Sequence, residues 1–192
     1  MTHATRTLLL VILTCFVSLS SFMGSAHGQG ENQTGTTTYR GIVLPPAPTV
    51  RGATAQPPPA WLVVDKKASA ASYGSFCYAT ACVDMVPPSM RPDLATVTAT
   101  RAQRVYALIQ SRTIGKVAVT LRPWTSPAST TVSARSVRAH RRQDGTWTVL
   151  TLTLSGPLKN QLLSAQVTFK AGGDASYLWR LNPSSRTVKS AR

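Results

Sequence analysis

From Trp61 to Leu181 the sequence is a succession of short apolar or alternating runs, and each run ends at a turn signal. Val117, Val119 and Leu121 alternate with less apolar residues, which is the period of two that a half-buried strand requires. Residues 101–111 fit a helix or a strand equally well, and no other stretch has a helical period. Short strands with turns at this spacing predict an all-β fold, an antiparallel β-sandwich of about seven to nine strands.

The clearest single strand follows the turn signal Asp144-Gly145 and runs from Trp147 to Leu154. Its apolar positions change phase between Val149 and Leu150. Because side chains alternate between the two faces of a strand, its two halves face opposite sides of the sheet unless a bulge intervenes. Further strands are expected at Trp61–Val64, Val105–Ile109, Thr131–His140, Leu162–Phe169 and Ser176–Leu181.

The N-terminus has the layout of a secretory signal. Arg6 precedes an apolar run from Leu8 to Phe22, and small residues allow cleavage after Ala26 or Gly28. The run is shorter than the roughly 20 apolar residues that a spanning helix needs, so removal of the signal is favoured over a permanent anchor. We therefore predict a signal peptide over residues 1–28 and a secreted or extracytoplasmic location.

A lipid anchor is not expected. Cys15 lies within the apolar run, and Thr14 stands before it where a lipid-modified cysteine needs a smaller residue. Contact with a membrane is therefore expected only through an uncleaved signal or a lipid anchor, both of which we disfavour.

The remaining chain divides by composition. Residues 29–59 are rich in Gly, Thr, Gln and Pro and lack a hydrophobic period, which predicts a flexible, disordered linker. Residues 60–182 contain the predicted β-sandwich domain. Residues 183–192 form a polar, basic C-terminal tail.

Two cysteines, Cys77 and Cys82, remain once the signal is removed. An even count in an exported chain predicts a disulfide between them. Their spacing is not the Cys-x-x-Cys of a redox site, so a structural role is favoured. Such a short closed loop contributes about 2 kcal/mol to stability, enough to pin a hairpin.

The sequence is strongly basic: it has 21 Lys and Arg residues against six Asp and Glu residues, which gives a formal net charge of +15. Such a field attracts polyanions such as acidic wall polymers, nucleic acid or anionic lipid, without specificity. Within an extended segment, Arg138, His140 and Arg142 fall on one face.

The other face of this segment carries Arg135 and Arg141. The five residues form a candidate polyanion-binding stripe, and the alternative is a solvated edge strand whose charges prevent aggregation. The stripe lacks the interleaved aromatic residues of a single-strand platform, so no specific nucleic acid is expected.

Catalysis is disfavoured by the side chains available. Residues 60–182 contain one histidine, His140, and no glutamate. The neighbouring arginines disfavour the imidazolium that a general base must form. One histidine and two paired cysteines do not make a zinc site. The sequence predicts a domain that is not an enzyme and that has no metal and no cofactor.

Two motifs support a family resemblance, Gly74-Ser75-Phe76-Cys77-Tyr78 with Cys82-Val83-Asp84, and Gly172-Gly173-Asp174-Ala175-Ser176-Tyr177. They resemble those of a group of uncharacterised bacterial exported proteins, many of them lipoproteins. The group has Tyr and Trp where this chain has Phe76 and Tyr78. The resemblance implies an immunoglobulin-like β-sandwich and no established activity.

The motif residues have structural interpretations. Gly74 permits a close approach or a positive φ, and Gly173 belongs to the Gly-Gly turn. Asp84 and Asp174 are expected to accept backbone N–H bonds in their loops, with Ca²⁺ binding by the two carboxylates as the rival. Tyr177 is expected to bury its ring and to bond a loop carbonyl through its hydroxyl. With the resemblance, the predicted function is a non-catalytic binding or structural module at the bacterial cell surface, for a cell-envelope component or an anionic polymer.

Overall fold

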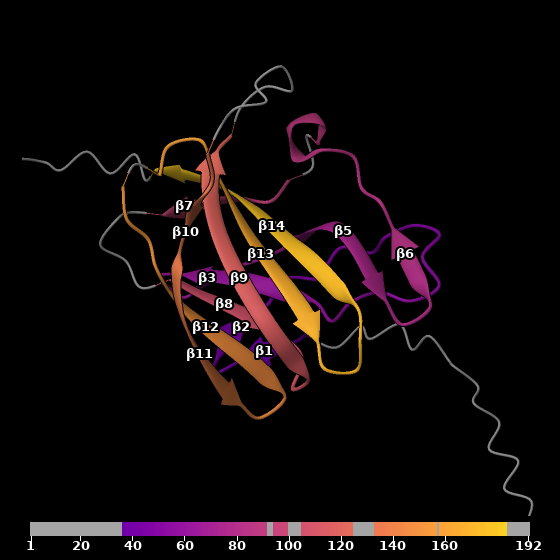
Figure 1. The fold of residues 1–192 in the computed structure, drawn as a ribbon. Coiled ribbons are helices and arrows are strands. Elements are labelled where there is room, and N and C mark those ends of the chain that lie inside the picture. The colour runs from indigo at the N-terminus through magenta and orange to yellow at the C-terminus, as the bar shows by residue number, and fades with distance from the viewer. Residues whose placement is uncertain (1–35, 92–93, 100–104, 125–132, 157, 184–192) are drawn as a thin grey trace, which may run out of the picture. The chain divides into compact units, whose positions relative to one another are not determined.

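The computed structural model describes residues 36–91, 94–99, 105–124, 133–156 and 158–183, all of which belong to the unit Gly35–Arg192. Two β-sheets face each other across a shared apolar core (Figure 1). This all-β arrangement confirms the predicted fold class. The predicted signal peptide, residues 1–28, and residues 184–192 of the predicted tail lie outside the described residues.

The larger sheet has seven strands and the smaller has five. In spatial order the larger contains β10 (Arg135–Ser136), β9 (Ile114–Pro123), β13 (Gln161–Phe169), β14 (Asp174–Pro183), β5 (Ser72–Tyr78) and β6 (Ala81–Val83), with β7 (Thr96–Ala99) parallel to the end of β14. The smaller contains β11 (Arg138–Asp144), β12 (Trp147–Thr153), β8 (Val105–Ile109), β3 (Ala60–Val64) and β4 (Lys67–Ala70). A separate two-stranded sheet pairs β1 (Thr38–Tyr39) with β2 (Ile42–Val43).

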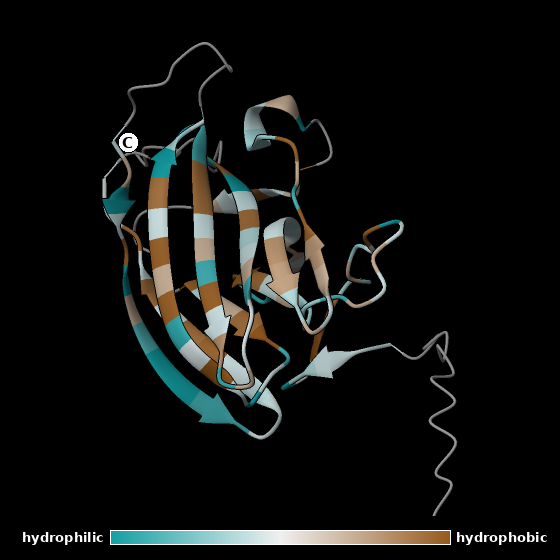
Figure 2. Ribbon diagram, turned by 45° about the vertical axis from the view of Figure 1, so that its right-hand side comes forward, coloured by the Kyte–Doolittle hydropathy of each residue, from teal (hydrophilic) through white to brown (hydrophobic). Residues whose placement is uncertain are grey.

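The core between the sheets is built by the alternation that the sequence displays. Strand β13 alternates buried and exposed positions from Ala165 to Phe169, and its buried side chains lie beside those of the neighbouring strands β9 and β14 on the inner face of the sheet. Trp179 on β14 is completely buried, and its indole N–H donates to the carbonyl of Ser69 on β4, so one side chain links the two sheets. Figure 2 shows the resulting apolar bands across the strands of the larger sheet.

The phase change in β12 needs no bulge. Its pairing with β11 and with β8 runs without a register shift. Leu150 points into the core between the sheets, whereas Val149 belongs to a second apolar cluster on the outer face of the five-stranded sheet. Both halves of the strand are buried because both faces of this sheet are covered.

The outer face is covered by part of residues 29–59, for which the composition predicts a disordered linker. For residues 36–59, the part that the structure describes, this prediction is wrong. Tyr39 and Leu44 are buried against Trp61 and Val149, and the indole N–H of Trp61 donates to the carbonyl of Pro45 at 2.7 Å. The segment is ordered because its few apolar side chains fill the second cluster.

One edge of the sandwich is closed by a strand that changes sheets. The chain pairs with β9 as β10, then crosses through Val137, whose N–H donates to the Val119 carbonyl, and pairs with β12 as β11. The described part of the predicted extended stretch Thr131–His140, from residue 133 on, is therefore an edge segment that is divided between the two sheets; residues 131–132 lie outside the described residues. Strand β11 is hydrophilic along most of its length (Figure 2), as edge strands that resist aggregation are.

Helical structure is slight. The described residues contain one short 3-10 helix, η1 (Pro88–Met90). Within these residues, no helix has the length and apolar character needed to cross a membrane.

Candidate functional site

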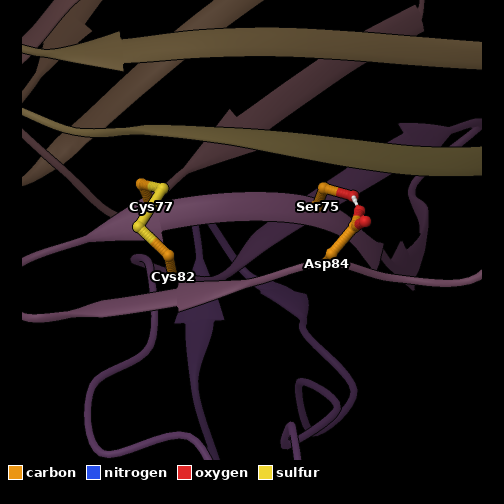
Figure 3. Close-up of a disulfide and its surroundings, with 4 residues drawn as sticks. All are labelled: Ser75, Cys77, Cys82 and Asp84. Carbon is orange, nitrogen blue, oxygen red and sulfur yellow. Dashed lines mark hydrogen bonds between the residues drawn. A yellow bond between two sulfur atoms is a disulfide. The ribbon is translucent and has the colours of Figure 1, made fainter.

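The predicted disulfide is present and lies in the hairpin of β5 and β6. Cys77 and Cys82 are directly opposite each other in this hairpin and form the bond across it (Figure 3). Both residues are exposed. The bond therefore fastens a hairpin at the edge of the larger sheet and is not part of the core.

A second clamp lies beside the disulfide on the same hairpin. The hydroxyl of Ser75 donates to Oδ1 of Asp84 at 2.6 Å (Figure 3). The N–H of Met85 donates to Oγ of Ser75 at 3.1 Å. Asp84 was expected to accept backbone N–H bonds in the loop. In the structure Asp84 accepts the Ser75 hydroxyl, and the oxygen of that hydroxyl accepts the backbone N–H of Met85.

The two motif glycines lie where strands approach closely. A Cβ at Gly74 would lie 2.8 Å from the Cβ of Ser176 on β14, so close approach, and not a positive φ, explains this glycine. At Gly173 both reasons hold, because φ is +87° and a Cβ would collide with the carbonyl oxygen of Cys77.

Asp174 begins β14 opposite Cys77 and is exposed. The adjoining turn is held by backbone bonds, from the N–H of Phe169 to the carbonyl of Gly173 and from the N–H of Gly172 to the carbonyl of Phe169. Among the described residues, no group of three or more His, Cys, Asp or Glu side chains is placed to hold a metal ion.

Tyr177 takes the position expected of it. Its ring is completely buried, and its hydroxyl donates to the carbonyl of Pro58 at 2.6 Å. Tyr73, which sequence reasoning missed, donates in the same way to the carbonyl of Pro57 at 3.0 Å. Burial raises the pKa of Tyr73 to about 12 and raises that of Tyr177 further. These hydroxyls hold the proline segment that leads into β3.

The five residues of the predicted polyanion stripe do not lie on one surface. Arg138 and His140 are exposed on β11, on the face that also carries Arg142. Arg141 points to the other face and donates from Nη1 to the carbonyl of Gly115 at 2.6 Å, linking the two sheets. Arg135 lies on β10, in the other sheet, beside Gly156. The structure therefore divides the stripe.

Arg142 belongs to a polar cluster centred on Asp144. Oδ2 of Asp144 accepts the hydroxyl of Tyr39 at 2.7 Å, Nη2 of Arg40 at 2.7 Å and Nη1 of Arg142 at 3.2 Å. Nη2 of Arg142 also donates to the Tyr39 hydroxyl at 3.0 Å. We call these four residues the Asp144 cluster. It fastens the N-terminal hairpin of β1 and β2 to the end of β11.

The cluster perturbs both of its acidic groups. The hydrogen bond from Tyr39, aided by Arg40 and Arg142, lowers the pKa of Asp144 below its ordinary value. Burial and the bond to the Asp144 carboxylate raise the pKa of Tyr39. Both changes favour the carboxylate together with the neutral phenol, which is the form that the hydrogen bond requires.

Sequence reasoning missed this cluster because two members lie in the presumed linker. The signal that would have found it is the apolar run Trp61–Val64, in which every residue is buried in the structure. Consecutive apolar residues indicate a strand covered on both faces, and only a further segment of the chain supplies the second cover.

A cavity of about 620 Å³ lies near Asp174 and Arg141. Its wall includes Leu150 and Val167 from the two sheets, and Lys116 also lines it.

Comparison with family models found no match, and comparisons with curated proteins and with solved structures found none either.

Proposed function

We propose that this chain is an exported, non-catalytic domain that binds a component of the bacterial cell envelope. The signal-like N-terminus and the resemblance to exported bacterial proteins support the location. The disulfide is consistent with an oxidising compartment outside the cytoplasm.

The proposal rests on one observation: the polar side chains with partners inside the domain hold its fold together, and exposed cations are left at the surface. Ser75 and Asp84 clamp a hairpin, Tyr177 holds the proline segment, and the Asp144 cluster fastens the N-terminal hairpin. These groups serve the fold, whereas exposed cations such as Arg138 stand at the surface. A stable scaffold with a basic surface fits recognition of a partner better than turnover of a substrate.

Polyanion binding through the stripe on β11 is a second candidate. The exposure of Arg138 and His140 on one face supports it. Arg141 and Arg142 are engaged in contacts within the domain. Polyanion binding at this stripe is therefore less favoured than binding at a site with several exposed cations.

The test uses the native protein purified from its source. We expect its intact mass to show removal of residues 1–28 or a nearby cut and the loss of two protons to the disulfide. We also expect it to bind isolated cell envelopes saturably at low salt. A full-length cytoplasmic protein, or envelopes that retain none of it, would contradict the proposal. So would a turnover that Asp84→Ala abolishes while the fold stays intact.

A further inference from the structure

Two hollows lie side by side where the hairpin of β1 and β2 covers the five-stranded sheet. One has a volume of about 210 Å³ and the other of about 680 Å³. Arg40 and Ile42 line both of them, so the hollows meet at the tip of this hairpin. We call the pair the outer groove.

The larger hollow is basic. Arg40, Lys66 and Lys67 line it, together with Val43 and neighbouring backbone. The side chain of Arg40 remains 62% exposed although it pairs with Asp144, and both lysines are exposed. Among the described residues, none of those lining the two hollows is acidic. The two exposed lysines and the exposed part of Arg40 are therefore accessible to an anionic ligand, whereas Arg142 is held by Asp144 and Tyr39.

The smaller hollow has a different character. Val63, Leu108 and the half-buried ring of Tyr106 line it, and Arg142 contributes a cation. An apolar and aromatic surface beside cations suits a ligand that carries both carbon-rich units and negative charge. Val43, which is 62% exposed, extends the apolar surface at the other end of the groove.

We propose that the outer groove binds an anionic envelope polymer in which phosphodiester groups alternate with sugar or polyol units. Phosphates would bind Lys66, Lys67 and Arg40, and the neutral units would lie over Tyr106 and its apolar neighbours. Arg40 lines both hollows, so a polymer that passes from one to the other runs beside its guanidinium. The proposal rests on the envelope-binding function above and names its site and ligand.

The ordered N-terminal hairpin creates this site. Tyr39, Arg40 and Ile42 all come from it, and the Asp144 cluster holds it in place. The groove differs from the stripe on β11, where Arg138 and His140 stand on an edge strand. The two sites can therefore be tested separately.

The experiment measures binding of a short synthetic poly(glycerol phosphate) to the mature protein by calorimetry at several salt concentrations. The test variant is Lys66→Gln/Lys67→Gln, and the matched control is Lys159→Gln/Lys170→Gln, which removes the same charge from exposed turns elsewhere. We expect the affinity of the test variant to fall roughly tenfold. The slope of log affinity against log salt concentration should become shallower by about two, one for each lysine–phosphate contact removed. The control should change affinity less than about twofold.

Further arms identify the ligand. Inorganic polyphosphate supplies charge without polyol units and should bind more weakly, and dextran supplies sugar without charge and should not bind. Equal losses in the test and control variants would overturn the proposal in favour of a diffuse charge effect. A loss confined to Arg138→Gln/His140→Gln would move the site to β11. Binding only to phosphatidylglycerol vesicles would replace the polymer by a membrane surface.

Failure here is distinguishable from failure of the proposed function. If the wild type binds isolated envelopes but not poly(glycerol phosphate), the groove proposal is wrong and the binding function stands. If the wild type binds neither, both are wrong.

Discussion

The hydroxyl of Tyr39 donates a 2.7 Å hydrogen bond to Oδ2 of Asp144, across 105 positions of the sequence. This contact joins the N-terminal hairpin to the turn between β11 and β12. The ring of Tyr39 also contacts the ring of Trp147 edge-on, and Trp147 contacts Trp61 in the same way. These contacts connect the hydrogen bond to the apolar cluster on the outer face of the five-stranded sheet. The segment before β3 is thereby a structural part of the domain.

The first prediction concerns this hydroxyl. Tyr39→Phe leaves the ring in place and removes both the donor to Asp144 and the acceptor of Arg142. We expect the free energy of unfolding to fall by about 1–2 kcal/mol in urea titrations. Tyr106→Phe, on the same face of the sheet, is the control and should change it by less than about 0.5 kcal/mol. Equal effects would show that the Asp144 cluster does not hold the hairpin.

The second prediction concerns pH. The folded protein lowers the pKa of Asp144 below 3.8, so the unfolded chain binds a proton at higher pH than the folded chain. The stabilisation is complete above that value and is lost as pH falls through the pKa of the folded state. We expect the thermal midpoint of the wild type to drop in this acidic window.

Asp144→Asn provides the comparison for this pH dependence. It should be less stable at neutral pH and should lose less stability on acidification. Parallel pH profiles for the two proteins would contradict the assignment. On the alkaline side, the raised pKa of Tyr39 predicts that the contact persists up to about pH 10 and weakens as pH rises through the pKa of the folded state.

The third prediction concerns the close approach of β5 and β14. Gly74→Ala introduces a Cβ that would lie 2.8 Å from the Cβ of Ser176. We expect a loss of about 1–3 kcal/mol in the free energy of unfolding, because two paired strands must separate. Ser176→Gly removes the opposing Cβ, so the double variant should recover part of this loss. Additive losses would rule out the steric explanation.

The fourth prediction concerns the disulfide between Cys77 and Cys82. Replacement of both residues by serine should lower the free energy of unfolding by about 2 kcal/mol, because the bond closes only a short loop. The far-UV spectrum should remain that of a β protein, since the hairpin lies at the edge of the sheet and the core lies elsewhere. Complete unfolding of this variant would show that the bond supports the core.

Much of the fold was predictable because its physics is local. Alternation at Val119 and Leu121 gave a strand with one buried face, and the paired cysteines gave the hairpin fastening. The sequence predicted that the Tyr177 hydroxyl would bond a loop carbonyl, and it does. It did not predict which carbonyl, because Pro58 lies 119 residues away along the chain.

The site was harder to predict because it depends on contacts between distant segments. The composition of residues 29–59 indicated disorder, and it gave no sign that Tyr39 and Leu44 would complete a cluster around Trp61. The basic run was correctly divided between two faces, but spacing alone does not show that Arg141 spans the two sheets. The phase change in β12 and the unbroken apolar run Trp61–Val64 were the two clues to a second covered face.

Hydrogen exchange over residues 36–50 of the mature protein tests the central claim most directly, that this segment is folded onto the five-stranded sheet. The N–H of Leu44 donates to the carbonyl of Thr37 at 2.9 Å, and Leu44 is buried. We expect this amide to exchange far more slowly than in an unfolded chain, and to lose protection in Tyr39→Phe. Exchange of the whole segment at the rate of an unfolded chain would contradict the docked hairpin, and with it the outer groove.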